Sequence, residues 1–256
     1  MSFDRVNAIK KLRQCLQKNE VTVGSWMQLP DSSVAEIMGE AGYDWIAVDL
    51  EHGSMSVDQL PDIFRALECG STLPLVRLAK GDMKDCKQAL DAGAGGVIVP
   101  MVESAEQLRA IKDACCWPPA GTRGVGFSRA NLFGKNFDSY MVEAQAPLLV
   151  AMIESICAVE HLQKILAVDG LDAILIGPYD LSASMGLTAQ FQHPDVKLAL
   201  RSIQELSKAS HIACGIHVVE PLPEELHKRI EEGYQFLAYS VDAVFLNRVI
   251  SNPYRS

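Results

Sequence analysis

Long apolar runs are absent from this sequence of 256 residues. No stretch approaches the roughly 20 apolar residues that a transmembrane helix requires, so we expect no membrane span. The first 20 residues lack the apolar core of a signal peptide and have the pattern of an amphipathic helix. The seven cysteines form no zinc-like spacing, and their odd number favours reduced thiols in a cytoplasmic protein over a disulfide framework.

Positive charge is also scarce. The sequence has 23 lysines and arginines against 32 aspartates and glutamates, which gives a formal net charge of −9. Such an acidic chain is not expected to bind nucleic acid as its main partner. An anionic substrate would need local positive charge, from an arginine or a metal ion, to overcome the repulsion of the whole chain.

Common phosphate-binding motifs are missing as well. The sequence contains no GxGxxG motif and no P-loop. Phosphate-binding barrels usually have glycine-rich turns after their last two strands, whereas the corresponding turns here, Val218–Pro221 and Ser240–Ala243, contain no glycine. A phosphosugar substrate is therefore not expected. Lys80 is the only lysine near a predicted strand end, so a Schiff-base aldolase has little support.

The sequence does contain a regular alternation of β-type apolar runs and helical patterns, which predicts parallel strands with crossover helices. The predicted strands are Val21–Gln28, Trp45–Glu51, Leu73–Ala79, Gly95–Met101, Leu148–Glu154, Ala173–Gly177, Cys214–Val219 and Phe236–Val241. The predicted helices are Ser33–Ala41, Val57–Leu67, Met83–Ala92, Ala105–Ala114, Ala158–Leu166, Val196–Ser207, Pro223–Glu232 and Ala243–Ile250. Eight such pairs, and a length close to the roughly 250 residues of a typical (β/α)8 barrel, favour a single α/β TIM-barrel domain over residues 1–256 rather than a doubly wound sheet.

One connection, Trp117–Ala146, is too long for a simple turn. It contains Pro-Pro, several glycines, aromatic residues, Arg123, Arg129 and Lys135. Long structured connections usually carry function or contact a partner subunit. The aromatic content disfavours a disordered segment.

Four apolar runs end on charged or ionisable residues, which are His52, Arg77, Glu154 and Asp180. The carboxyl ends of barrel strands meet at one rim, so we expect these side chains to lie together. Glu154 and Asp180 end consecutive strands, and two carboxylates completed by water and substrate oxygens suit Mg²⁺ or Mn²⁺. The alternative is that each carboxylate caps the helix that follows it.

His52 can act as a general base at the rim if a carboxylate, either Asp49 or Glu51, fixes its tautomer. Arg77 interrupts an otherwise apolar strand, and its guanidinium suits a substrate carboxylate or an enolate oxygen. The alternative partner of Arg77 is a carboxylate of the barrel itself.

Other residues complete the expected pocket. Trp26, at the end of the first strand, is a candidate apolar wall. Gly177–Ser182 has the pattern of a tight turn into a helix start, whose free amides suit a substrate carboxylate. His217 lies within an apolar strand and is either a core residue or a rim residue.

At these positions the sequence resembles the HpcH/HpaI aldolase family, the class II pyruvate aldolases. The resemblance extends over nearly the whole chain and rests on several ordered, well-spaced motifs. They are Gly24–Trp26, Asp49–His52, Val76–Arg77, Leu90–Gly93, Val99–Val102, Pro118–Gly124, Ile153–Glu154 and Gly177–Ser182.

The resemblance implies a (β/α)8 barrel assembled as a hexamer, a trimer of dimers, with the C-terminal helix swapped between subunits. It also implies a divalent metal (Mg²⁺, Mn²⁺ or Co²⁺) held by Glu154 and Asp180. Arg77 would then contact the keto or enolate oxygen of pyruvate. The His52–Asp49 pair would move protons through water.

Further roles are implied by the same resemblance. The amides near Tyr179 and Asp180 would hold the pyruvate carboxylate. Asp91 would reach into the site of a neighbouring subunit. The sequence departs from the family pattern at Met152, where many members have glutamine, and this puts the positioning of pyruvate and the preferred substrate in question.

The resulting hypothesis is the reversible aldol cleavage of a 4-hydroxy-2-oxo acid to pyruvate and an aldehyde. One alternative is a citrate-lyase-like enzyme acting on an acyl-CoA thioester, which needs a basic patch for the CoA phosphates. Another is a catalytically silent barrel that serves as a binding or assembly subunit. The retained carboxylates, His52 and Arg77 argue against the silent barrel.

Overall fold

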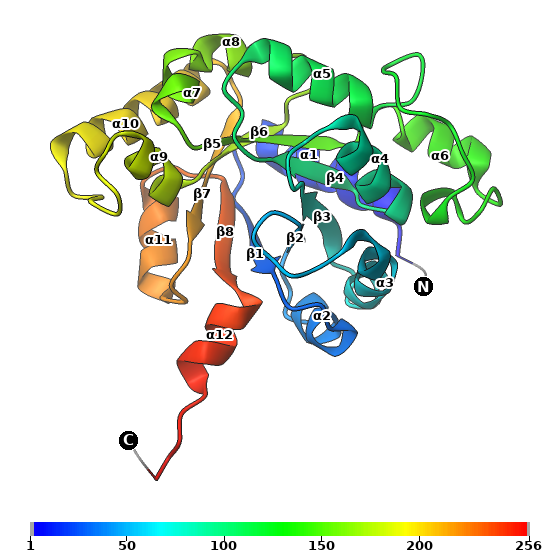
Figure 1. Cartoon of the computed structure of the whole chain (residues 1–256), viewed down its shortest axis with the longest axis horizontal. Helices are drawn as coiled ribbons and strands as arrows, with labels where there is room; N and C mark the ends of the chain where they lie inside the picture. The colour runs from blue at the N-terminus through cyan, green and yellow to red at the C-terminus, as the bar shows by residue number, and fades with distance from the viewer. Residues whose placement is uncertain (1–2, 255–256) are drawn as a thin grey trace.

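The computed structural model describes residues 3–254, which form a closed barrel of eight parallel strands in sequential order (Figure 1). The strands are β1 Thr22–Met27, β2 Trp45–Asp49, β3 Leu73–Arg77, β4 Gly96–Val99, β5 Leu148–Ile153, β6 Ala173–Ile176, β7 Ala213–Val218 and β8 Phe236–Val241. The helices are α1 Arg5–Gln17, α2 Ser32–Gly39, α3 Leu60–Cys69, α4 Met83–Ala92, α5 Ala105–Cys115, α6 Phe137–Glu143, α7 Ile156–Glu160, α8 Leu162–Leu166, α9 Pro178–Ser184, α10 Pro194–Ala209, α11 Pro223–Glu231 and α12 Asp242–Val249. Because β1 pairs with β8, the predicted TIM barrel is confirmed and the doubly wound sheet is excluded.

Local sequence patterns explain these elements. Strands such as β2 (WIAVD) and β5 (LLVAMI) are buried along their whole length, as expected for parallel strands covered on both faces. The surrounding helices are amphipathic. Helix α3, for example, buries one face whose residues follow the helical spacing, namely Leu60, Ile63, Phe64 and Leu67.

The barrel interior is filled by large aromatic side chains near its N-terminal end. The Trp45 ring stacks on Phe236, with 4.2 Å between the ring centroids. Gly24 makes room for Trp45, since a Cβ at this position would lie 2.1 Å from the indole ring. Helix α1 packs its buried residues Ile9, Leu12 and Leu16 against the same interior cluster. The predicted N-terminal helix thus covers the end of the barrel opposite to the rim that carries the charged residues.

The predicted elements differ from the observed ones mainly at their ends. Most strands stop one or two residues earlier than predicted, since the polar residues at the rim turn into loops and leave the strand pairing. The predicted helix Ala158–Leu166 consists of two short helices, α7 and α8, which meet at His161. The long connection Trp117–Ala146 contains helix α6 and a 3₁₀ turn, Arg129–Asn131.

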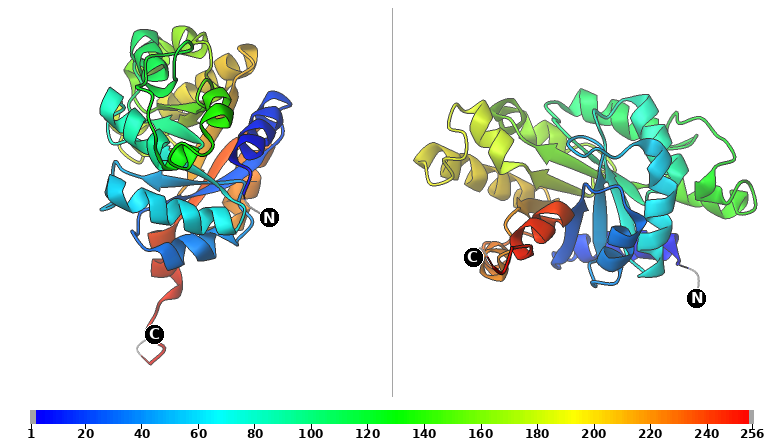
Figure 2. Two further views of the ribbon diagram at one scale, coloured as in Figure 1. Left: turned by 90° about the vertical axis from the view of Figure 1, so that its right-hand side faces the viewer. Right: turned by 60° about the horizontal axis from the view of Figure 1, so that its bottom comes forward.

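The C-terminal segment leads away from the barrel (Figures 1 and 2). The side chains of Val249 and Ile250 are 76% and 72% exposed. The exchange of α12 between subunits stays a prediction. Among residues 3–254, none of the helices combines the length and the apolar character that crossing a bilayer requires.

Candidate functional site

A layer of functional side chains lies at the C-terminal rim, above the apolar barrel interior. Trp26, Asp49, Arg77 and His217 are the last or next-to-last residues of β1, β2, β3 and β7, and Glu154 directly follows β5. TIM-barrel enzymes have their active sites at this face. The closed barrel therefore brings together residues that are far apart in the chain.

Asp49 accepts hydrogen bonds from several other residues of this layer. Its fully buried carboxylate accepts two hydrogen bonds from Arg77, 2.8 Å from Nε and 2.6 Å from Nη2. The Gln28 side-chain amide donates to the same carboxylate at 2.9 Å, and the backbone amides of Glu51 and His52 donate at 3.0 and 3.3 Å. Burial alone raises the pKa of Asp49, but the hydrogen bonds and charge of Arg77 outweigh this effect and hold the pKa below its ordinary value.

Arg77 is held in one orientation by these contacts. Its guanidinium lies over the Trp26 ring, 5.3 Å from the centroid, and Nη1 lies 3.0 Å from Oε2 of Glu51. The ion pair with barrel carboxylates, which was the alternative for this residue, is therefore present. The pair with Asp49 uses Nε and one proton of Nη2. Nη1 faces Glu51, and the second Nη2 proton is left over.

The Glu154 carboxylate is buried and is held in place by its neighbours. Its Oε2 accepts a hydrogen bond of 2.9 Å from the amide of Met101, whose left-handed backbone (φ 49°) aims that amide. Gly177 provides space, since a Cβ there would lie 2.4 Å from Oε1 of Glu154. Burial, together with the charges of Glu51 and Asp180, raises the pKa of Glu154 to about 7 against the opposing effect of the Met101 amide.

Helix capping does not explain the two rim carboxylates. Ser155, not Glu154, caps α7, because its hydroxyl accepts a hydrogen bond of 3.1 Å from the amide of Ala158. Asp180 lies inside the first turn of α9, whose N-cap residue is Gly177. The capping alternative is therefore wrong for both residues.

The carboxyl groups at the rim are electrostatically suited to a divalent cation. Asp180 raises the pKa of both Glu51 and Glu154, in addition to the effect of burial on each. A cation between such groups would offset their mutual repulsion. Within residues 3–254, no group of three or more His, Cys, Asp or Glu side chains is arranged to hold a metal ion. The arrangement fits an ion such as Mg²⁺, which takes one or two carboxylates and keeps several waters.

His52 is exposed at the rim, in the loop that follows β2. Its amide, rather than its imidazole, points at Asp49, and no side-chain contact between the two is made in the described part of the chain. The oxygens of Asp49 are already used by Arg77, Gln28 and two amides. Glu51 is the carboxylate that interacts electrostatically with His52. Burial raises the pKa of Glu51, and the charge of His52 acts in the opposite direction.

The other predicted residues lie at different depths. Tyr179 is 49% exposed at the start of α9. Met152 points into the barrel two residues before Glu154 and is buried among apolar side chains. Asp91 is half-buried near the end of α4, away from the rim, and does not join the site of its own chain. Burial raises the pKa of Asp91, and the charge of Arg123 opposes this effect.

Two contributors were not identified from the sequence. Gln28 directly follows β1 and orients the Asp49 carboxylate, and a polar residue at the end of an apolar run is a signal that could have found it. Met101 acts through its backbone amide, so its side chain carries no signal.

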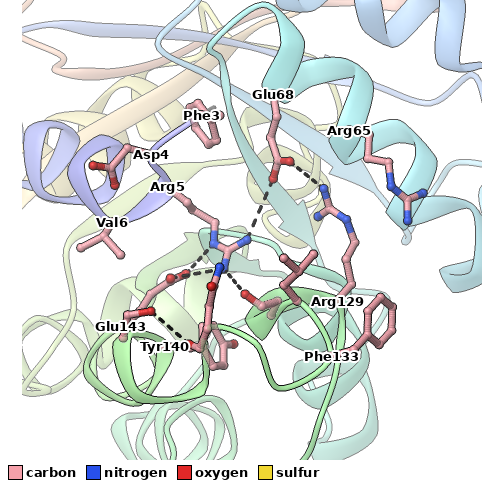
Figure 3. A pocket seen from close by; sticks show the side chains of 14 residues that line it. Phe3, Asp4, Arg5, Val6, Arg65, Glu68, Arg129, Phe133, Tyr140 and Glu143 are labelled. Carbon is pink, nitrogen blue, oxygen red and sulfur yellow. Dashed lines mark hydrogen bonds and ion pairs between the residues drawn. The ribbon is translucent and has the colours of Figure 1, made fainter. Parts of the chain in front are cut away.

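A cavity with a volume of about 690 Å³ lies away from the rim, between α1, α3 and α6 (Figure 3). Arg5 donates to the Glu143 carboxylate at 2.5 and 3.2 Å and to the carbonyl of Ala130 at 2.7 Å. Arg129 donates to Glu68 at 2.6 Å. The two arginines are thus matched by glutamates. These interactions connect α1 to the long connection Trp117–Ala146. The charges of the two arginines are therefore used within the protein and do not point to a substrate site.

Comparisons with known proteins agree with this geometry. The profile of one family, described as HpcH/HpaI aldolase/citrate lyase, matches residues 22–248. The chain is 37% identical to a hydroxypyruvate/pyruvate aldolase of Roseobacter denitrificans, covering 93% of each chain. It is 37% identical to a 2-keto-3-deoxy-L-rhamnonate aldolase of Klebsiella pneumoniae, covering 92% of this chain and 88% of the relative. A crystal structure of an HpcH/HpaI aldolase/citrate lyase family protein from Burkholderia cenocepacia superposes with a TM-score of 0.88 at 31% identity, covering 93% of this chain and 95% of the other.

Proposed function

This chain belongs to the HpcH/HpaI aldolase/citrate lyase family, and we propose that its rim residues catalyse the reversible aldol cleavage of a 4-hydroxy-2-oxo acid. The enzyme is a class II pyruvate aldolase, a carbon–carbon lyase that yields pyruvate and an aldehyde. The observation that carries the assignment of roles is the juxtaposition of a buried Glu154, with its pKa raised to about 7, and the immobilised guanidinium of Arg77.

The family implies a divalent metal, and we propose that Glu154 and Asp180 hold it, as Mg²⁺, Mn²⁺ or Co²⁺. The oxygen ligands and the pKa effects at these carboxyl groups support this assignment. When bound, the cation supplies Lewis-acid polarisation of the substrate's keto oxygen.

Arg77 stabilises the negative charge that develops on the C2 oxygen when the C3–C4 bond breaks. The second Nη2 proton, which is not used by Asp49, is the donor for this oxygen, since Nη1 faces Glu51. Since Asp49 and Trp26 hold the guanidinium in place, little reorganisation is needed during the reaction. Removal of one donor of this kind costs about 3 kcal/mol in comparable sites.

His52 takes the proton of the 4-hydroxyl group through a water molecule. The electron pair of the C3–C4 bond then moves onto C3 and the C2 oxygen, the aldehyde departs, and protonation at C3 gives pyruvate. The exposure of His52 supports a role through water. The free amides of Tyr179 and Asp180 at the start of α9 are assigned to the pyruvate carboxylate.

We further propose a cytoplasmic hexamer, a trimer of dimers, in which α12 is exchanged and Asp91 reaches the site of a neighbour. The exposed apolar side chains of Val249, the last residue of α12, and of Ile250, which follows it, support the exchange. Light scattering after size exclusion tests the assembly. A Val249→Glu/Ile250→Glu variant that stays hexameric would rule out the exchange of α12.

The acyl-CoA alternative is less supported because its candidate basic residues are engaged. The Arg123 guanidinium is buried, with 1% of the residue exposed, and donates to the hydroxyl of Tyr140. Arg129 is paired with Glu68. Of the three basic residues considered in the loop, Lys135 is the one that remains as a candidate to bind the phosphates of CoA.

The test of the function is pyruvate release from a 4-hydroxy-2-oxo acid, followed with and without EDTA. Glu154→Gln should abolish release and weaken Mn²⁺ binding in calorimetry. The matched control is Glu106→Gln, an exposed residue of α5. Full activity in EDTA would reject the metal role, and full activity of Glu154→Gln would reject the site.

A further inference from the structure

Asp242 is a buried residue at the rim that the proposed reaction does not use. It directly follows β8 as the first residue of α12, and only 3% of it is exposed. Three backbone amides donate hydrogen bonds to its carboxylate, those of Gln28 at 2.9 Å, Leu29 at 2.9 Å and Ala243 at 2.7 Å. The two oxygens of a carboxylate can accept all three, and these hydrogen bonds offset the cost of burying the charge.

These hydrogen bonds join two strand ends beyond the point where regular pairing stops. The last aligned pair of β1 and β8 is Trp26 with Val241, and the register between the two strands shifts just before it. The amides of Gln28 and Leu29 lie beyond this pair, and the Asp242 carboxylate takes the place of a strand partner for them. The start of the loop after β1 is therefore fixed by a side chain of the neighbouring strand end.

Gln28 connects Asp242 to the catalytic side of the rim. Its backbone amide donates to Asp242, and its side-chain Nε2 donates to Oδ2 of Asp49 at 2.9 Å. The same Oδ2 accepts a hydrogen bond from Nη2 of Arg77 at 2.6 Å. Nη2 carries the proton that is the proposed donor to the C2 oxygen of the substrate. Successive contacts thus lead from Asp242 to the reacting part of the site.

Electrostatic repulsion makes this connection dependent on its hydrogen bonds. Burial raises the pKa of Asp242, the three amides oppose this effect, and the negative charge of Asp49 adds to the rise. The two carboxylates therefore repel each other. Gln28 supplies one donor to each of them. If Asp242 no longer held the backbone of Gln28, the side chain of Gln28 would lose its fixed position against Asp49.

We propose that Asp242 is a positioning residue that sets the orientation of Arg77 through Gln28 and Asp49. Without its carboxylate, Nη2 of Arg77 is aimed less accurately at the C2 oxygen, and the transition state loses much of one hydrogen bond. This inference rests on the proposed aldolase function.

The test is a double-mutant cycle in the pyruvate-release assay. Asp242→Asn keeps the shape of the side chain but turns an NH₂ group towards a backbone N–H, and Gln28→Met removes the contact with Asp49. Each variant should lower kcat about tenfold with KM nearly unchanged, because the contact with the C2 oxygen strengthens in the transition state. The double variant should be no slower than the slower single variant, since both act through the same contact.

Two further variants serve as checks. Asp44→Asn is the matched control, because Asp44 accepts the amide of Val23 at 2.9 Å near the opposite end of β1. This variant should keep the kcat of the wild type. Asp242→Ser, which retains one acceptor oxygen on a shorter side chain, is the second variant at the proposed position and should show the same selective loss of kcat. A purely structural role of Asp242 would not lower kcat selectively.

Calorimetric binding of oxalate in the presence of Mn²⁺ separates this inference from the proposed function. Oxalate has the planar shape and charged oxygens of the pyruvate enolate. It should bind about tenfold more weakly to Asp242→Asn and to Gln28→Met, with no further loss in the double variant. Additive effects in either measurement, or an unchanged kcat in Asp242→Asn, would overturn the inference. Absence of pyruvate release from the wild type, with a non-additive loss of oxalate binding, would instead reject the aldolase function and retain Asp242 as a positioning residue.

Discussion

Replacing Asp49 by asparagine should destabilise the protein through Arg77. The asparagine keeps nearly the same shape but removes the charge that faces a guanidinium whose side chain is only 9% exposed. Glu51, 3.0 Å from Nη1, is then the remaining carboxylate near Arg77. Breaking a buried pair by removing one partner costs about 3–5 kcal/mol, and the loss here is expected towards the lower end because Glu51 still offsets part of the buried charge.

The expected loss is large enough to measure directly. For a chain of this size, 1 kcal/mol shifts Tm by roughly 2–4 °C, so Asp49→Asn should lower Tm by roughly 6–20 °C. Urea unfolding followed by circular dichroism should show a lower midpoint with an unchanged slope. All variants are compared at one protein concentration, because assembly contributes to apparent stability.

Asp62→Asn provides the matched control. Asp62 pairs with Arg65 on the surface of α3, where the two side chains are 76% and 55% exposed. Surface pairs contribute about 0–1 kcal/mol, so this variant should unfold close to the wild type. In the double variant Asp49→Asn/Arg77→Met, part of the lost stability should return, because the incompletely compensated charge of Arg77 is no longer buried. Equal midpoints for Asp49→Asn and Asp62→Asn, or additive effects in the double variant, would refute the argument.

Three further predictions concern the rim. His52→Ala should lower kcat by roughly 100-fold to 10,000-fold with Mn²⁺ binding retained, and an unchanged kcat would remove His52 as the base. Gly177→Ala should weaken Mn²⁺ binding about 10–100-fold, because its Cβ displaces the Glu154 carboxylate, whereas Gly126→Ala has open space and should bind normally. His217 has its pKa lowered to about 4, from an ordinary 6.5, so it binds protons more readily in the unfolded chain. Its contribution to stability is therefore present above pH 6.5 and lost as the pH falls towards 4. Between pH 7 and 4.5 the wild type should lose roughly 2–3 kcal/mol relative to His217→Asn, and parallel urea midpoints would contradict this.

Several features of this protein were determined by its sequence alone. Apolar runs of strand length alternating with amphipathic patterns predicted the barrel, because this alternation is typical of a parallel sheet covered by helices. Arg77 interrupts the apolar run of the predicted strand Leu73–Ala79, so its position at the rim was predicted before its partners were known. Strand ends were displaced by a residue or two, because the pattern records burial and not hydrogen-bond pairing.

The tertiary structure alone decided how the rim residues meet. The partner of Asp49 depends on the register of β2 with β3, which places Asp49 opposite Arg77 and leaves His52 to face the solvent. His217 could be read as core or rim until barrel closure placed its ring against Trp26. These contacts join residues that are distant in the chain, and their geometry is set by the closure of the whole barrel. No local pattern of residues encodes that closure, so the chemistry of the site is a property of the folded chain.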